Sequence, residues 1–298
     1  MTSNYMSKEG TALINVARYL ITSQIGERLR TIDSLSEEFS ISVGLIQKAL
    51  TTLENDSSIS LRKQGRNGTF IEHLNFDLLA KRAGLSHVVC AMPLPYTKHY
   101  EGLASGLKAQ LGDLPLYFAH MRGADARAQC LKSGVHDIAI VSRLAARELL
   151  AGIKVAVDLG ENSYSLEHKL ICREGAFSQI KRVGVDPSSP DQRILTKRAF
   201  ENQDVEVVNI NYANCLTLLM EGVIDAVVWL PEALDMNRFG LEEKSLHHIP
   251  ECQEASQAVM LIRKDAHHIN ALLENLLDIN QLLHHQRQVV TGDITPSY

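Results

Sequence analysis

Several features that would mark a membrane protein, a secreted protein or a common enzyme class are missing from this chain of 298 residues. No apolar run approaches the roughly 18 residues that a membrane helix needs, and the N-terminal segment MTSNYMSKEGTA lacks the apolar stretch of a signal peptide. The motifs GxGxxG, GxxxxGK[ST] and GxSxG do not occur. We therefore expect a cytoplasmic protein with no cofactor and no enzyme activity.

Disulfide and metal patterns are missing as well. The five cysteines are spaced about forty residues apart without a CxxC pair, which indicates reduced thiols rather than a disulfide framework. Three His-His pairs occur, but adjacent residues point apart on a helix, and no HExxH motif accompanies them. The sequence therefore predicts no metal site.

Length and charge suit a two-domain binding protein. The net charge of −5 argues against a protein that coats nucleic acid non-specifically, but it leaves room for a local basic face. The apolar pattern changes along the chain, and we expect a domain over residues 1–75, a linker over 76–85 and a second domain over 86–298.

The N-terminal segment has the pattern of helices followed by a hairpin. Apolar spacing predicts a first helix over residues 11–27. A second helix opens near Thr31, Asp33 or Ser34, and Ser34 with Glu37 fits a capping box.

The third helix is the clearest element of the sequence, and Ser42 is its expected N-cap. Its apolar stripe comprises Ile46, Ala49, Leu50 and Leu53, and its opposite face carries Val43, Gly44, Gln47, Lys48 and Thr51. Two short strands follow, with Asn67-Gly68 as a tight turn in which both residues tolerate positive φ. This order predicts a winged helix-turn-helix, which places its third helix in the major groove of DNA.

On these residues the segment resembles the GntR superfamily of bacterial transcription regulators. The matching positions are Ile41-Ser42, Ile46, Ala49-Leu50, Leu53-Glu54 and the wing from Gly65 to Ile71. The resemblance implies double-stranded DNA as a partner. The expected DNA-contacting residues are Thr31, Ser42, Gln47, Lys48, Arg62, Gly65, Arg66 and Gly68.

Charge in this domain predicts modest affinity for DNA. Asp33, Val43 and Gln47 stand where family members carry arginines, and arginine forks are the commonest readers of guanine. Residues 1–77 hold eight Lys and Arg against nine Asp and Glu. Because phosphate neutralisation drives DNA affinity, one such domain should bind DNA weakly. We therefore expect a homodimer in which two tethered N-terminal domains, here called heads, bind together. A winged helix that serves protein contacts instead is the alternative.

Beyond the linker, short β-rich runs alternate with helices. We expect strands at 87–92, 116–119, 137–141, 155–157, 169–172, 182–185, 205–210, 225–229 and 259–262, and helices at 97–111, 124–132, 190–202 and 213–221. The last helix carries Ile269, Leu272, Leu273, Leu276 and Leu283 on one face. This alternation is typical of a parallel-rich α/β architecture.

Two similar groups followed by a returning strand resemble the two-lobed fold of type II periplasmic solute-binding proteins, which LysR-type effector domains share. Taken whole, the chain is similar to the YhfZ family of enteric bacteria. The fold class expected is therefore an N-terminal winged helix-turn-helix joined to a two-lobed α/β domain.

Ligands of open α/β sheets bind at the carboxyl ends of strands, so the loops that end each strand are expected to line an inter-lobe cleft. The expected ligand-binding residues are Tyr96, Thr97, Ser142, Arg143, Ser188, Ser189, Asn211, Tyr212 and Trp229. Helix-capping Ser and Asn residues with Arg143 favour a small anion. Plain capping, packing and surface roles for the same residues remain alternatives.

These patterns together predict a one-component transcription regulator whose small-molecule effector binds in the second domain. Two other classes stay open at this point: a ligand sensor that acts through protein contacts without DNA, and an α/β enzyme.

Overall fold

The structure is a computed structural model that describes residues 6–85, 87–111, 114, 116–231 and 235–298. Its chain forms two compact units. The N-terminal unit comprises Met1–Val88, Gln110–Tyr117 and Asp265–Leu277, and the C-terminal unit comprises Val89–Ala109, Phe118–Lys264 and Asp278–Tyr298. Within the described residues, no helix has both the length and the apolar character needed to cross a membrane.

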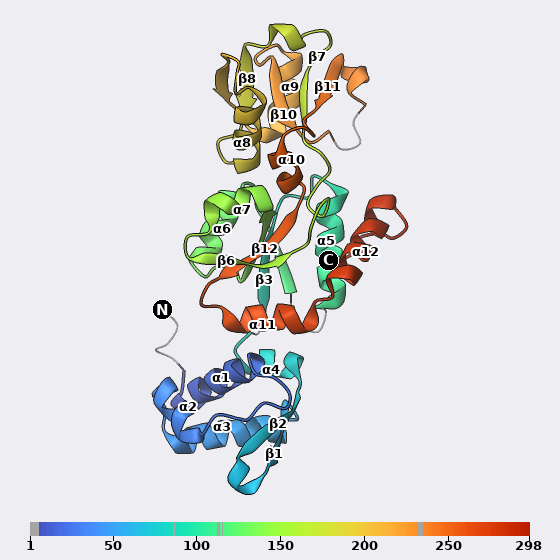
Figure 1. Cartoon of the computed structure of the whole chain (residues 1–298). Helices are drawn as coiled ribbons and strands as arrows, with labels where there is room; N and C mark the ends of the chain where they lie inside the picture. The colour runs from blue at the N-terminus through green and yellow to red at the C-terminus, as the bar shows by residue number, and fades with distance from the viewer. Residues whose placement is uncertain (1–5, 86, 112–113, 115, 232–234) are drawn as a thin grey trace. The chain divides into compact units, whose positions relative to one another are not determined.

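The N-terminal unit is a helix-turn-helix followed by a two-stranded antiparallel wing, shown in blue and cyan in Figure 1. The elements are α1 (Lys8–Ile21), α2 (Ile32–Phe39), α3 (Val43–Asn55), β1 (Ile59–Lys63), β2 (Thr69–Leu74) and α4 (Phe76–Arg82). Ile46 and Leu53 of α3 are fully buried, as the apolar stripe predicts. The segment expected to be a linker contains α4, which packs on α1.

Helix α1 ends at Ile21, six residues earlier than predicted. The residues that follow it pair with the wing instead. The amide of Gly26 donates to the carbonyl of Ile71 at 2.7 Å, and Arg28 forms an antiparallel bridge with Phe70. Pairing with a strand distant in sequence overrides the helical periodicity of this segment.

Of the three N-cap candidates for α2, the structure selects Thr31, whose hydroxyl accepts from the Ser34 amide at 3.2 Å. The capping box of Ser34 with Glu37 is therefore wrong, and so is the tight turn expected at Asn67-Gly68. At the wing tip the positive-φ residues are Gly65 (54°) and Gly68 (95°), and Asn67 is not among them. A 3₁₀ turn over Gly65–Asn67 replaces the two-residue turn.

The C-terminal unit contains two five-stranded sheets. In the first sheet the strand order is β4-β3-β5-β12-β6. Its strands are β3 (Val88–Met92), β4 (Leu116–His120), β5 (Ile138–Ser142), β6 (Ile153–Asp158) and β12 (Ala258–Arg263), and its helices are α5 (Lys98–Gln110), α6 (Ala124–Lys132) and α7 (Arg143–Leu149). Strand β12 is antiparallel to both β5 and β6.

The second sheet has the order β11-β7-β10-β8-β9. Its strands are β7 (Lys169–Arg173), β8 (Arg182–Val185), β9 (Glu206–Asn209), β10 (Ala226–Trp229) and β11 (Leu241–Ser245), with α8 (Pro190–Ala199), α9 (Cys215–Met220) and α10 (Pro250–Ala255). The chain passes to this sheet after β6 and returns at β12, as Figure 1 shows. Leu144 of α7 packs into the hydrophobic core of the second sheet, so an apolar contact joins the two sheets.

The strands expected from the sequence all occur, but both sheets are mixed rather than largely parallel, since β7 and β12 run antiparallel to their neighbours. Strand β11 and helices α7 and α10 were not predicted. The final helix is two helices, α11 (His267–Leu276) and α12 (Ile279–Thr291). Leu277 is extended between them, and Asp278 caps α12 by accepting from the Gln281 amide at 3.1 Å.

Candidate functional site

The outer face of α3 is exposed in the N-terminal unit. Gln47, Lys48 and Thr51 are exposed, and the side chain at Val43 is 37% exposed. Ser42 occupies the N-cap position of α3, as expected, but its side chain makes no capping hydrogen bond. A groove of about 640 Å³ lies between the start of α2, this face of α3 and the wing. Of the expected DNA-contacting residues, Thr31, Gln47 and Gly68 line this groove.

The cations of this unit differ in whether a carboxylate already engages them. Lys48 is 2.8 Å from Glu9, and Arg62 is 2.6 Å from Glu72. Exposed pairs of this kind contribute little to stability, and a phosphate group can compete for the cation. In the part of the chain that the structure describes, Arg28, Lys63 and Arg66 are exposed cations with no ion pair of this kind.

Arg28 is held against the wing. A Cβ built on Gly68 would lie 2.6 Å from the Nε atom of Arg28, so the glycine leaves the space that the guanidinium occupies. The positive φ of Gly68 favours glycine for a second, independent reason. The wing therefore presents Arg28 together with Lys63 and Arg66, and both Arg28 and Lys63 lie outside the DNA-contacting residues that we expected from the sequence.

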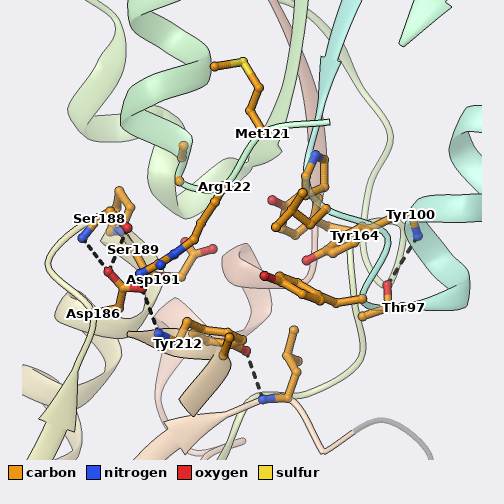
Figure 2. Close-up of a pocket in the computed structure, with 18 of the residues that line it drawn as sticks. Thr97, Tyr100, Met121, Arg122, Tyr164, Asp186, Ser188, Ser189, Asp191 and Tyr212 are labelled. Carbon is orange, nitrogen blue, oxygen red and sulfur yellow. Dashed lines mark hydrogen bonds and ion pairs between the residues drawn. The ribbon is translucent and has the colours of Figure 1, made fainter. Parts of the chain in front are cut away.

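A cavity of about 330 Å³ in the C-terminal unit is lined by loops from both sheets (Figure 2). Of the residues expected from the sequence, those that line it are Tyr96, Thr97, Ser188, Ser189, Tyr212 and Trp229. The loop after β10 was expected to contribute as far as Glu232, which lies outside the described residues.

Three expected residues are not among those that line this cavity. Ser142 contacts the cavity only through Asp191, because its hydroxyl donates to the cavity-lining carboxyl of Asp191 at 2.6 Å. Arg143 forms an ion pair with Asp158. Asn211 accepts from the Ala213 amide at 3.0 Å, which is a capping role.

Asp186 is the most heavily hydrogen-bonded group of the cavity wall. It accepts from the Ser188 amide at 2.9 Å, the Ser188 hydroxyl at 2.7 Å and the Tyr212 amide at 3.0 Å, and it forms an ion pair with Arg122. Burial raises the pKa of this carboxyl, but these hydrogen bonds outweigh burial and leave the pKa below its usual value. Figure 2 shows Arg122 reaching toward Asp186, with Ser188 and Ser189 alongside.

Two further charged groups, Arg127 and Asp191, line the cavity. The Arg127 guanidinium is buried, and it donates to the carbonyls of Ile140 at 3.0 Å and Met121 at 2.8 Å and to the Tyr164 hydroxyl at 3.1 Å. Burial raises the pKa of Asp191 to about 6, and the charge of Arg127 offsets part of this shift. Asp191 is therefore largely ionised near neutral pH and acquires its proton in mildly acidic conditions.

Aromatic rings form much of the remaining wall. Tyr96 and Tyr212 are stacked with centroids 6.3 Å apart and an angle of 29° between planes, and Tyr212 lies 6.3 Å from Trp229. The rings of Tyr100 and Tyr164 are 4.9 Å apart. Tyr and Trp side chains offer an apolar ring face together with a polar atom that can form hydrogen bonds.

Several cavity residues were not found from the sequence: Tyr100, Arg122, Arg127, Tyr164, His168 and Asp191. Arg122 follows β4, so the rule that ligands meet strand ends would have located it. Tyr164 and His168 lie in the segment that joins the two sheets, where no local pattern marks them. Asp191 occupies the first turn of α8, where acidic residues are common because they interact favourably with the helix dipole. Its sequence position therefore gives no sign of a role in the cavity.

The described residues contain no group of three His, Cys, Asp or Glu side chains placed to hold a metal ion. All five cysteines are free, and four of them are buried. Burial raises the pKa of Cys90 and of Cys215 to about 12, so both are neutral thiols at neutral pH.

An N-terminal helix-turn-helix and a two-sheet α/β unit with a cavity between strand-end loops define a class of protein in which a DNA-binding fold accompanies a solute-binding fold. Comparisons with known proteins support this assignment. Residues 24–71 match the model "Helix-turn-helix domain", and residues 76–298 match the model "YhfZ C-terminal domain". The chain belongs to the YhfZ family, which confirms the resemblance to that family found in the sequence.

A full-length relative agrees with this assignment. The chain is 45% identical to "Uncharacterized protein YhfZ" of Escherichia coli strain K12 over 301 residues, covering all of both chains. The crystal structure of YhfZ from Shigella flexneri, also 45% identical, matches 75% of this chain and 98% of that chain with a TM-score of 0.68.

More distant solved structures share the fold alone. A Corynebacterium glutamicum OxyR C206 mutant is 11% identical, with a TM-score of 0.50 over 96% of this chain and 94% of that chain. An ancestral arginine-binding protein is 15% identical, with the same TM-score over 70% of this chain and 96% of that chain. The predicted fold class, a helix-turn-helix joined to a solute-binding-protein-like α/β unit, is confirmed.

Proposed function

We propose that this protein is a cytoplasmic transcription regulator that binds double-stranded DNA through α3 and the wing. A small molecule held in the cavity of the C-terminal unit is its effector. The regulator acts as a homodimer and has no enzyme activity.

The observation that carries the proposal is the juxtaposition of an exposed α3 face with a cationic wing. Gln47 and Lys48 are exposed on α3, and Arg28, Lys63 and Arg66 are exposed at the wing, on the two elements that a winged helix presents to duplex DNA. Basic side chains supply most of the affinity for the phosphate backbone, while α3 side chains reach base edges.

The arrangement also supports two heads acting together. Lys48 and Arg62 are each engaged by a carboxylate, so one head offers few unengaged cations to the phosphates. Tethering two heads raises the effective concentration of the second to the millimolar range, which turns modest single-head binding into useful affinity. Half-sites about one helical turn apart, or multiples of it, match such a dimer.

An electrophoretic mobility shift with the intergenic DNA upstream of the protein's own operon tests the proposal directly. We expect a shift whose logarithmic affinity falls with the logarithm of salt concentration, with a slope on the order of −5 to −7 if about six to eight phosphates are neutralised per dimer. An unrelated duplex of equal length is the control for sequence preference. No shift by the dimeric protein at low salt, with or without candidate effectors, would refute DNA binding.

The effector need not be an anion. Arg143 and the capping residues were the reason to expect an anion, but Arg143 pairs with Asp158 and does not line the cavity. Of the guanidinium groups that do line the cavity, Arg122 pairs with Asp186, and Arg127 is bonded to two carbonyls and a tyrosine. We infer that features other than negative charge select the effector.

One observation favours a second candidate, a sensor that acts through protein contacts. The carboxylates that engage Lys48 and Arg62 reduce the positive charge that α3 and the wing present. Such a sensor would bind its ligand and ignore DNA, so the salt titration separates the two candidates.

A further inference from the structure

The cavity is unusually rich in polar aromatic side chains. The chain has sixteen aromatic residues, seven of them Phe, eight Tyr and one Trp. The cavity is lined by Tyr96, Tyr100, Tyr164, Tyr212 and Trp229 and by no phenylalanine among the described residues. Each of these rings offers an apolar face for stacking and one polar atom at its edge.

The aromatic rings of the cavity come from loops and strand ends of both sheets. Tyr96 follows β3 of the first sheet, whereas Tyr212 and Trp229 follow β9 and end β10 of the second. The rings of Tyr96 and Tyr212 are stacked with 29° between their planes, and Tyr96 is 51% exposed. A planar ligand ring can therefore extend this existing stack.

Two nitrogen atoms of the wall have no hydrogen-bond partner within the described part of the chain. They are Nδ1 of His168, a residue only 4% exposed, and Nε1 of Trp229. Burial lowers the pKa of His168 to about 4, so its ring is neutral at neutral pH. Both atoms have less than 1 Å² of accessible surface, so a ligand in the cavity does not reach them, and His168 contributes no charge to the wall.

The charges of the wall balance. Arg122 and Arg127 contribute two positive charges, and Asp186 and Asp191 contribute two negative charges near neutral pH. A ligand with a net charge would lose part of its hydration in this partly enclosed site. The described part of the wall offers no uncompensated opposite charge that would offset this loss. The size of the cavity, about 330 Å³, corresponds to the liquid volume of on the order of ten water molecules.

From the polar aromatic rings and the balanced charge, we propose that the effector is an uncharged, planar heteroaromatic compound. Its size is one or two fused rings, on the order of ten to fifteen non-hydrogen atoms. This inference rests on the proposed function only in taking the cavity to be the effector site. The ligand ring stacks on the pair formed by Tyr96 and Tyr212.

The only tryptophan of the chain lines the cavity, so its fluorescence reports on occupancy without a label. Full-length protein is titrated to millimolar concentration with adenine, hypoxanthine and nicotinamide, which are uncharged planar heterocycles. Inorganic phosphate, succinate and putrescine serve as charged, non-aromatic counterparts. We expect a saturable change in Trp229 emission with at least one heterocycle and none with the charged compounds. Isothermal calorimetry confirms each saturable signal.

Variants at Tyr96 connect binding to the stack. Tyr96→Ala removes the ring and is expected to weaken heterocycle binding by roughly 5- to 150-fold, the range for loss of one base–aromatic stack. Tyr96→Phe keeps the ring and should stay within about twofold. Phe239→Ala, an exposed ring that does not line the cavity, is the matched control and should leave binding unchanged.

The outcomes separate this inference from DNA binding, which is measured in the same preparation without ligand. Saturation by no heterocycle, saturation by a charged compound instead, or equal affinity of Tyr96→Ala and wild type would each overturn the inference while leaving DNA binding standing. Heterocycle binding that follows the Tyr96 series without any DNA shift would support the inference and remove the regulator proposal.

Discussion

Arg122, which follows β4 of the first sheet, forms an ion pair with Asp186, which follows β8 of the second sheet. The pair lines the cavity that the two sheets share. Asp186 also accepts two hydrogen bonds from Ser188 in its own loop and one from Tyr212 in the loop after β9. This carboxylate therefore holds two loops of the second sheet together and also contacts the opposite wall through Arg122.

Asp186→Asn is expected to destabilise the protein by about 1–3 kcal/mol at neutral pH, because an amide cannot balance the Arg122 charge and accepts fewer bonds. The folded-state pKa of Asp186 lies below the ordinary value of 3.8, so its contribution is present above that pH and is lost as pH falls through the folded pKa. Urea unfolding at several pH values measures this difference. Asp204→Asn, at an exposed position, is the control and should have little effect.

Asp191→Asn should behave in the opposite sense. Burial raises the folded-state pKa of Asp191 from 3.8 to about 6, in surroundings that include Ser142, Arg127 and Glu148. The folded state thus loses stability relative to the unfolded chain as pH rises from about 4 to about 6, by up to roughly 3 kcal/mol. The amide removes this loss and still accepts from the Ser142 hydroxyl, so the variant should be more stable than wild type at pH 7. Equal pH profiles for the two proteins would contradict the assignment.

Gly68→Ala is expected to weaken the wing and DNA binding together. The substitution combines a positive φ of 95° with a Cβ that would lie 2.6 Å from the Arg28 Nε. Gly26→Ala is the matched control, because its φ is 88° but no atom lies within 4 Å of the added carbon. Both variants should lose stability from backbone strain, on the order of 1–3 kcal/mol. A mobility shift should show additional loss of affinity only for Gly68→Ala, since only this change displaces Arg28.

Lys48→Ala and Arg66→Ala should each weaken binding to all duplex sequences by a similar factor. If each residue meets one phosphate per head, the magnitude of the salt slope falls by roughly two per dimer for each variant. Lys197→Ala, on α8 of the C-terminal unit, is the control. A slope that stays at the wild-type value in both α3 and wing variants would count against the docking proposed here.

Glu9→Gln tests whether the ion pair with Lys48 restrains DNA binding. The change releases Lys48 and removes one negative charge from each head, so we expect affinity for DNA to rise a few-fold at low salt and the gain to fade at high salt. Glu37→Gln, which removes the same charge from α2, separates the specific pair from the general charge effect. Equal gains in both variants would assign the effect to net charge alone.

Much of this architecture was predictable from local patterns. The buried stripe of α3, the N-cap at Ser42 and the strand-like runs of the C-terminal unit depend on residues close together in sequence, and the structure confirms them. Mistakes occurred where partners distant in sequence decide. Pairing of Arg28 with Phe70 ended α1 early, and antiparallel pairing of β7 and β12 made both sheets mixed.

The leucine spacing around Leu276 continues through the break between α11 and α12, so periodicity alone does not show two helices there. Asp278, an N-cap inside that apparent helix, was the one local signal of the break. Side-chain periodicity reports which face is buried, whereas backbone direction is set by the elements against which that face packs.

The sequence by itself determined the helix-turn-helix, the alternating strands and helices, and the loops where a ligand would bind, because hydrophobic period and capping act over a few residues. Only the tertiary structure decided which charges meet. It brought Arg122 to Asp186 and Asp191 to Ser142, and it directed Arg143 to Asp158. Electrostatic pairing depends on distances of a few ångströms between groups tens of residues apart, and such distances exist only once the chain is folded.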